Sequence, residues 1–172
     1  MILLVGLGNI GLDYGNTYHN VGFQCLSFLG EGEFKQDQKL ESFILTQAGI
    51  VYAKPSTMMN RSGRAVQKIQ AYYDIPRTQT IIIHDDSDIA LGQYKIQANR
   101  GSGGHNGIAS IMSSCGGKEM TRIRIGVRSE RFQAFKAKDF VLKPISVSDK
   151  GVLDTVYERI KEDLPQVIQQ LI

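Results

Sequence analysis

Two short runs of this sequence are apolar at nearly every interior position. They are Met1–Val5 and Gln79–His84, and the second is rich in β-branched residues. Runs of this length and composition are typical of strands that are buried on both faces of a sheet. Because both faces must then be covered by helices, these runs predict a layered α/β fold.

Strand and helix patterns alternate along the rest of the chain. Further strands are expected at 42–47, 50–54, 94–98 and 122–127, the first two as a hairpin whose second strand ends at Pro55. Helices are expected near 21–29, 58–73 and 108–115, and from Ser148 onward, where Pro165 is expected to divide the last helix in two. Residues 30–38 are expected to form a loop, and 139–142 a short strand within an irregular segment from 129 to 147.

These patterns predict one domain over residues 1–172. The expected architecture is an α/β three-layer sandwich, with a mixed, largely parallel twisted sheet and helices on both faces. In the helix near 58–73, the three-to-four residue spacing predicts a buried face formed by Ala65, Val66, Ile69, Tyr72 and Tyr73.

The composition is that of an ordinary soluble globular protein, with 42% hydrophobic and 22% charged residues. No apolar run has the length of a membrane span, and the N-terminus lacks a basic leader with a cleavage site. We therefore expect a cytoplasmic protein with no membrane partner. Cys25 and Cys115 are expected to be buried, reduced thiols.

Positive charge is concentrated in one part of the chain. Residues 95–143 contain ten lysines and arginines and three acidic residues, a net charge of +7, whereas the whole chain carries +3 and the remainder therefore −4. Such an uneven distribution is typical of a protein whose basic face binds a polyanion, with nucleic acid as the first candidate. A solvated basic surface without a partner is the alternative.

The first loop matches a nucleotide-binding motif by letter. Gly6, Gly8 and Gly11 have the spacing of the dinucleotide fingerprint, which requires a helix to begin inside the glycine run. The residues that follow, 13–17, are poor helix formers. A glycine-rich connection between strand and helix, or a loop that brings the backbone and Asn9 close to a substrate, is therefore favoured over nucleotide binding.

Four polar clusters follow predicted strand ends or begin predicted helices, and the carboxyl ends of parallel strands meet at one edge of a sheet. A histidine, a carboxylate and several carboxamides would then share one pocket, a set that suits ester cleavage by water. The sequence contains no Gly-x-Ser-x-Gly nucleophile elbow, and the cysteines have no activating neighbour. The clusters are Asn9–His19, Met59-Asn60, Asp85–Asp88 and His105-Asn106.

Simpler interpretations of the same residues stay open. His19 could merely begin a helix, His84 could be structural, and Asn60 could be an N-cap. The acidic cluster could form a turn or bind a divalent metal, which would make the protein a metal-dependent phosphohydrolase centred on Asp85, Asp86 and Asp88. Gly101–Gly107 could bind phosphate, and the basic face could belong to a non-catalytic RNA-binding module.

Six blocks of the sequence, in this order, closely resemble the bacterial peptidyl-tRNA hydrolase family over nearly the whole chain. The resemblance implies a compact α/β domain that is monomeric, without an obligate protein partner, and without a metal or another cofactor. It implies hydrolysis of the ester between a peptide and the 3′-terminal ribose of tRNA, which recycles tRNA from stalled translation. The blocks are GLGNIG (6–11), YHNVG (18–22), KPSTMMNRSG (54–63), HDDSD (84–88), GSGGHNG (101–107) and RIRIGV (122–127).

The resemblance also implies roles for individual residues. His19 would be the general base and Asp85 its partner, while Asn9, Asn60 and Asn106 would position the peptide, the water and the oxyanion. Tyr14 and Met59 would line the peptide channel, and His105 would shape its loop or contact the substrate. The acceptor end of the tRNA would be bound through its phosphates by Lys95, Arg100, Arg122 and Arg124. The chain departs from the family pattern at Ile10, Met58 and Gln97, where proline, phenylalanine and a basic residue are usual.

Overall fold

The computed structural model describes residues 1–172 and contains one seven-stranded sheet, in the order β2-β3-β4-β1-β5-β7-β6. The four adjacent strands β4, β1, β5 and β7 run parallel, and the pairings β2–β3, β3–β4 and β6–β7 are antiparallel. The predicted mixed, mostly parallel sheet is thus confirmed. The strands are β1 (Ile2–Gly6), β2 (Lys35–Asp37), β3 (Ser42–Gln47), β4 (Ile50–Pro55), β5 (Thr80–Ala90), β6 (Tyr94–Ala98) and β7 (Thr121–Arg128).

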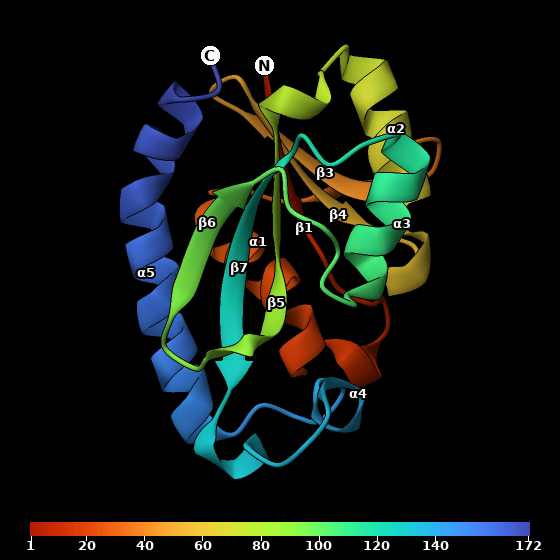
Figure 1. Cartoon of the computed structure of the whole chain (residues 1–172). Coiled ribbons are helices and arrows are strands. Elements are labelled where there is room, and N and C mark those ends of the chain that lie inside the picture. The colour runs from red at the N-terminus through yellow and green to blue at the C-terminus, as the bar shows by residue number, and fades with distance from the viewer.

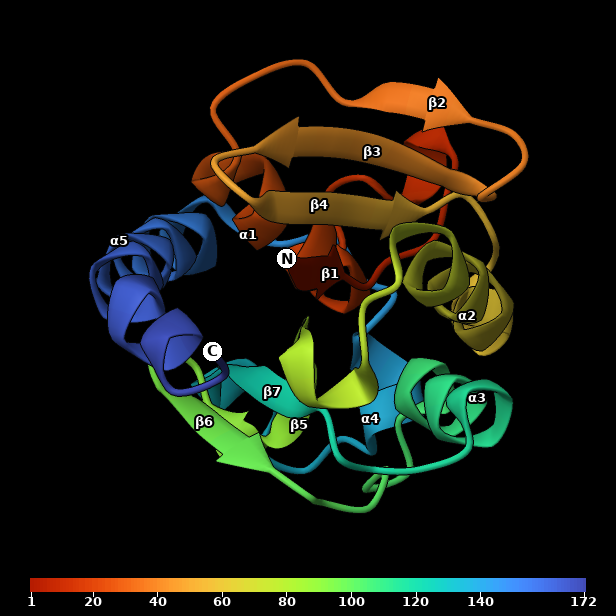
Figure 2. The ribbon, with the colours of Figure 1, turned by 90° about the horizontal axis from the view of Figure 1, so that it is seen from above.

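Helices cover both faces of this sheet. Figure 2 shows α1 and α5 on one side and α2 and α3 on the other. The three-layer arrangement expected from the sequence is therefore confirmed. The helices are α1 (Val21–Leu29), α2 (Ser62–Tyr73), α3 (Asn106–Cys115), the short α4 (Ala137–Phe140) and α5 (Val147–Gln169). A helix with the length and hydrophobicity needed to span a lipid bilayer is absent from the structure.

Alternate residues of the central strands enter two separate cores. Ile2 and Leu4 of β1 belong to the core under α1 and α5, whereas Leu3 and Val5 belong to the core under α2 and α3. Side chains of a strand point to opposite faces in turn, so a strand between two helical layers must be apolar throughout. This packing explains why the run at the start of the chain has no polar position.

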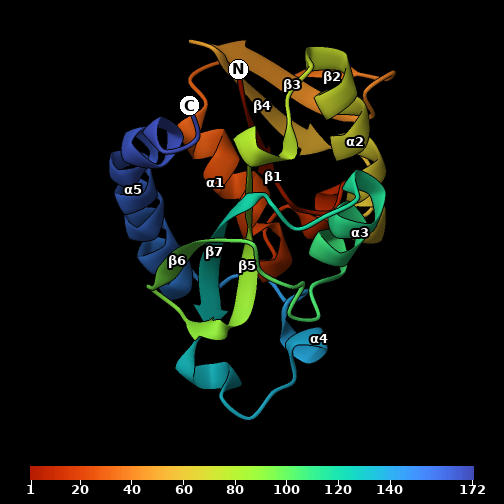
Figure 3. The same ribbon diagram turned by 45° about the horizontal axis from the view of Figure 1, so that its top comes forward.

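The carboxyl ends of the parallel strands lie at one end of the molecule. In Figures 1 and 3, β5 and β7 run toward α4, away from the end where both chain termini lie. The loop after β1 pairs with the segment after α4 through Thr17 and Pro144, and the glycine-rich loop descends to the end of α3 that is nearer α4 (Figure 1). The polar clusters of the sequence are therefore brought to the same edge of the sheet.

Several expectations about local structure were wrong. Residues 35–37 form the edge strand β2 instead of a loop, because a short, exposed edge strand can be polar and so lacks an apolar alternation. Residues 137–140 form α4 and not a strand. Helix α5 continues through Pro165, since Leu164 and Val167 on either side of it remain buried in the same core.

Two further differences concern side chains. Tyr72 was expected in the buried face of α2, but it is 69% exposed and its ring packs edge-on against Tyr73. Strand β5 was expected to end at His84, yet it continues to Ala90, with an irregular register after Asp86. The acidic cluster therefore lies within a strand that pairs with β7, and not in a turn after it.

Candidate active site

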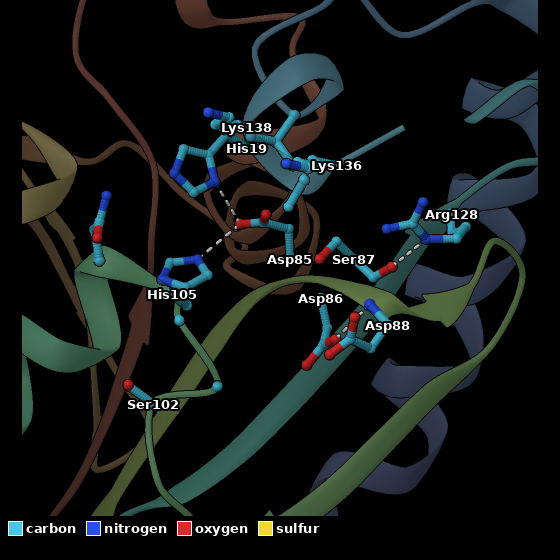
Figure 4. A pocket seen from close by; sticks show the side chains of 15 residues that line it. His19, Asp85, Asp86, Ser87, Asp88, Ser102, His105, Arg128, Lys136 and Lys138 are labelled. Atoms are coloured by element: carbon cyan, nitrogen blue, oxygen red, sulfur yellow. Dashed lines mark hydrogen bonds and ion pairs between the residues drawn. The ribbon is translucent and has the colours of Figure 1, made fainter. Parts of the chain in front are cut away.

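Asp85 is the centre of the polar site at the edge of the sheet. It lies on β5, is 3% exposed, and its Oδ1 binds two imidazoles. His19 Nδ1 lies 2.8 Å from this oxygen and His105 Nε2 lies 2.9 Å from it. Figure 4 shows the two rings on either side of the carboxylate. Segments distant in the sequence thus meet at one buried oxygen, as the positions of the polar clusters predicted.

The hydrogen bonds of His105 fix which of its nitrogens carries the proton. Its side chain caps the N-terminus of α3, where Nδ1 accepts hydrogen bonds from the backbone N–H groups of Gly107 and Ile108 at 3.1 and 3.4 Å. An imidazole nitrogen that accepts must be unprotonated, so Nε2 carries the hydrogen and donates it to Asp85. His105 is therefore neutral in this arrangement, with both nitrogens engaged.

His19 is left with one free nitrogen. It lies in the 3-10 turn Tyr18–Asn20 just before α1, and its backbone N–H donates to the Val141 carbonyl at 2.7 Å. Because Asp85 is an acceptor, Nδ1 of His19 carries the hydrogen and its Nε2 keeps a lone pair. Nε2 has no hydrogen-bond partner in the protein, and the His19 side chain is 14% exposed. This nitrogen can accept a proton from a molecule in the pocket.

The charges of the site shift the pKa values of its groups. Burial lowers the pKa of His19, but the charge and the hydrogen bond of Asp85 outweigh it, so its pKa lies above the ordinary 6.5. Burial alone would raise the pKa of Asp85, yet the two histidines hold it well below its usual range. Asp85 is therefore ionised at neutral pH and favours the protonated form of His19.

A third histidine, His84, packs against the residues of the site. His84 is buried, its Nδ1 donates to the backbone carbonyl of Asp85 at 2.7 Å, and its ring packs edge-on against His105 with centroids 4.7 Å apart. Complete burial lowers the pKa of His84 well below 6.5. His84 is thus a neutral packing residue, which agrees with its structural interpretation from the sequence.

A cavity of about 470 Å³ opens over His19, Asp85 and His105, and most of the residues that line it are polar. Asn106, the exposed first residue of α3, forms part of its wall. Lys136 and Lys138, from the α4 region, lie at the same cavity (Figure 4). Sequence reasoning counted these lysines only in the overall charge, because a polar, aperiodic segment gives no sign of where it folds back.

Asn9 is held in place by two neighbours. The side-chain oxygen Oδ1 of Asn9 accepts a hydrogen bond from the Met59 N–H at 2.8 Å. The Asn20 side chain binds the Asn9 backbone twice: its Oδ1 accepts from the Asn9 N–H, and its Nδ2 donates to the Asn9 carbonyl, both at 2.9 Å. The Nδ2 group of Asn9 is left as a donor without a partner in the protein. Asn20 was not singled out from the sequence, since only the folded loop shows its two contacts.

The remaining predicted substrate residues surround the site less directly. Met59 is 4% exposed and packs in the core beside Gly107, so it supports the wall instead of forming an open channel. Asn60 is exposed in the 3-10 turn Met59–Arg61 and caps no helix, which removes its N-cap interpretation. Tyr14 is half-buried in the turn Leu12–Tyr14 and does not line the cavity.

The three aspartates do not converge on one point, so the geometry disagrees with the phosphohydrolase alternative. Asp85 and Asp86 are neighbours on a strand and point apart, as Figure 4 shows. Asp86 pairs with Arg124 at 2.7 Å and accepts from the Asp88 N–H at 2.9 Å. A metal between Asp85 and the histidines would also need the lone pair of His105 Nε2, which is protonated here.

The basic residues divide into two groups. Lys95 and Arg100 are exposed, as expected for contacts with phosphate. Arg122 and Arg124 are only 4% and 7% exposed, and Arg124 is bound to Asp86 and to the Gln97 side chain. Both arginines are therefore too buried for the contacts with surface phosphates that the family resemblance implies for them. Alternation along β7 indicated their face correctly but could not show that Asp86 of β5 and Gln97 of β6 bind Arg124.

Comparisons with known proteins find similar sequences and structures over nearly the whole chain. The family model for peptidyl-tRNA hydrolase matches residues 3–172. A peptidyl-tRNA hydrolase from Campylobacter concisus is 37% identical over 180 residues, covering 99% of this chain and 95% of the relative. One from Bdellovibrio bacteriovorus is 43% identical over 151 residues, covering 83% and 79%. The crystal structure of peptidyl-tRNA hydrolase from Acinetobacter baumannii has a TM-score of 0.89 and 28% identity, covering 99% of this chain and 89% of that one.

Proposed function

The chain belongs to the peptidyl-tRNA hydrolase family and hydrolyses peptidyl-tRNA, and we propose that His19 is the general base of this reaction. The supporting observation is the His19–Asp85 hydrogen bond, which occupies Nδ1 and leaves Nε2 free toward the cavity. The Asp85 carboxylate raises the pKa of His19 above its ordinary value, and a histidine is the side chain suited to exchange protons with water as a general base.

In the proposed reaction, His19 Nε2 takes a proton from a water molecule as its oxygen attacks the ester carbonyl carbon. The carbonyl π electrons move to oxygen and give a tetrahedral oxyanion. When this intermediate collapses, the bond from carbon to the ribose oxygen breaks, and protonated His19 returns the proton to that oxygen. The products are a peptide carboxylic acid and tRNA with a free hydroxyl group.

Asp85 has two functions in this scheme. It holds the Nδ1–H tautomer of His19, and it stabilises the imidazolium that forms when the water is deprotonated. Its burial and its second bond, to His105, keep the carboxylate in one orientation. No covalent enzyme intermediate is needed, because water is the nucleophile.

Side-chain amides would supply the neutral donors of the site. The bond from the Met59 N–H to Asn9 Oδ1 fixes the orientation of the Asn9 amide, whose Nδ2 has no partner in the protein. Asn106 lies on the cavity wall next to His105. Asn60 lies exposed beside α3. We propose that these three position the peptide, the attacking water and the oxyanion, without adding charge that would shift the pKa of His19. Tyr14 and Met59 would shape the peptide side of the site.

The tRNA would bind across the exposed basic residues. Lys95 and Arg100 lie on and after β6, and Lys136 and Lys138 line the cavity itself. Phosphate contacts supply affinity and salt dependence without reading the sequence, which suits an enzyme that must accept many tRNAs. We further propose that the acceptor end is the part recognised, and that residues 1–172 act as one monomeric domain in the cytoplasm, with no cofactor or obligate protein partner.

The direct test is release of the acyl group from N-acetylated aminoacyl-tRNA in the presence of a chelator. Wild-type protein should release it, and His19→Ala should reduce turnover by about two to four orders of magnitude, the usual contribution of a general base. Circular dichroism and thermal unfolding would establish that the variant folds. Wild-type turnover by folded His19→Ala would exclude His19 from the role.

A further inference from the structure

A second pocket, of about 330 Å³, is lined by Asn9 and by residues to which the mechanism above gives no role. Its volume is in the range of small-ligand pockets. Its walls come from the loop after β1, from α1, from the segment between α1 and β2, and from the β3–β4 hairpin. The residues that carry the argument are Asn9, Asn20, Phe34, Phe43 and Lys54.

The pocket is continuous with the catalytic segments. Asn9 lines it, and the same side chain binds the Met59 backbone beside the active site. Asn20 also lines it and follows His19 directly in the chain. Asn9 and Asn20 therefore place this pocket next to the segments that carry Met59 and His19.

The position of the pocket in the sheet separates it from the basic strand. In the strand order, β3 and β4 lie on one side of β1, and β6 lies at the far edge beyond β5 and β7 (Figure 2). The exposed Lys95 is on β6. With the RNA bound near β6, the peptide part of the substrate would extend from the catalytic centre in the opposite direction, toward β4 and β3. The pocket lies on that side.

The chemistry of the pocket combines aromatic rings with one amine. Phe34 and Phe43 are two of its walls, and Lys54 Nζ lies 4.0 Å from the centroid of the Phe34 ring. The amine donates to the Ser27 hydroxyl and pairs with no carboxylate. Burial lowers the pKa of Lys54 to about 8, so the amine still carries a proton at pH 7. A half-buried cation without a counter-ion favours a ligand that supplies negative charge.

We propose that this pocket receives a side chain of the substrate peptide from a residue preceding the ester-linked one, and that Lys54 makes it prefer an acidic side chain to a basic one. Apolar contact with the phenylalanines would hold the methylene groups, and the amine would pair with the carboxylate. The inference rests on the proposed function, since it requires the peptide to extend past Asn9 from His19.

The test compares N-acetyl-X-alanyl-tRNA substrates in which X is glutamate, glutamine or lysine. For the wild type, kcat/KM should be about two- to fivefold higher for glutamate than for lysine, with glutamine between them, the range expected for one partly exposed ion pair. Lys54→Met should remove this preference, and Lys54→Arg should keep it. Lys35→Met, which removes the same charge from the exposed strand β2, is the matched control and should leave the preference unchanged.

N-acetyl-alanyl-tRNA lacks residue X and separates the two possible failures. If the wild type cleaves it but treats the three X substrates alike, the pocket proposal is wrong while the hydrolase mechanism stands. The same conclusion follows if folded Lys54→Met keeps the preference for glutamate. If N-acetyl-alanyl-tRNA itself is not cleaved, the proposed function fails, and the pocket proposal fails with it.

Discussion

His105 Nε2 lies 2.9 Å from Asp85 Oδ1, the same oxygen that holds the catalytic candidate His19. His105 also caps α3 through its other nitrogen, so one side chain connects the start of a helix to the carboxylate of the site. This double contact gives His105 a positioning role that acts through Asp85, and it leads to the first prediction.

Replacing His105 should separate its two contacts. His105→Ala loses the helix cap and the bond to Asp85, and should cost about 1 kcal/mol of stability and about tenfold in kcat. His105→Asn can restore the cap with its shorter side chain, so unfolding should return toward wild type while kcat stays low. Chemical denaturation and steady-state kinetics measure the two effects. A parallel recovery of kcat in His105→Asn would argue against the role through Asp85.

The rate should depend on pH through His19. A general base must be unprotonated, so kcat/KM should rise with pH and level off above the pKa of His19. Because Asp85 raises this pKa, the midpoint should lie above 6.5. The measurement is kcat/KM for N-acetylated aminoacyl-tRNA from pH 5 to 8, corrected for spontaneous hydrolysis. A rate that does not fall at acidic pH would contradict the role of His19.

The buried and exposed basic residues should behave differently when they are neutralised. Lys95→Gln should weaken RNA binding and reduce the slope of log affinity against log salt by about 1, with little effect on stability. Arg124→Gln leaves Asp86 without its buried partner and should cost about 3 kcal/mol of stability. RNA titrations at several salt concentrations, together with urea unfolding, distinguish the two. Equal effects of both variants on stability would contradict the assigned burial.

Gly22 should be essential for packing the first helix onto the sheet. A Cβ there would collide with the carbonyl oxygens of Ile83 and Leu7, both backbone atoms that cannot move aside easily. Gly22→Ala should therefore lose about 3 kcal/mol or more of stability. Gly151→Ala, in open space on α5, is the control and should gain up to about 1 kcal/mol. Similar unfolding midpoints for the two variants would contradict this packing.

Much of the fold follows from local patterns. The apolar runs at Met1–Val5 and Gln79–His84 predicted strands between two helical layers, and the polar clusters after them predicted one shared site. The shared edge of parallel strands predicted that a histidine and a carboxylate would meet, and the family resemblance singled out His19 and Asp85 as that pair. The alternation at 122–127 likewise predicted which face of β7 carries arginine.

Features that depend on distant partners could not be predicted. The burial of Arg124 requires Asp86, 38 residues earlier, and nothing in the local pattern distinguishes it from an exposed arginine. The bond from His105 to Asp85 depends on where a glycine-rich loop folds back. The continuation of α5 through Pro165 depends on the core contacts of its neighbours, which outweigh the local preference of proline for a break.

The central claim is that the Asp85 carboxylate sets both the tautomer and the pKa of His19. The measurement that tests it most directly is the pH profile of kcat/KM for Asp85→Asn beside the wild type, with folding verified by circular dichroism. We predict that the maximum falls by about two to four orders of magnitude and that the acidic midpoint moves to lower pH, because the charge that raises the pKa of His19 is gone. An unchanged midpoint with a near wild-type maximum would contradict the account.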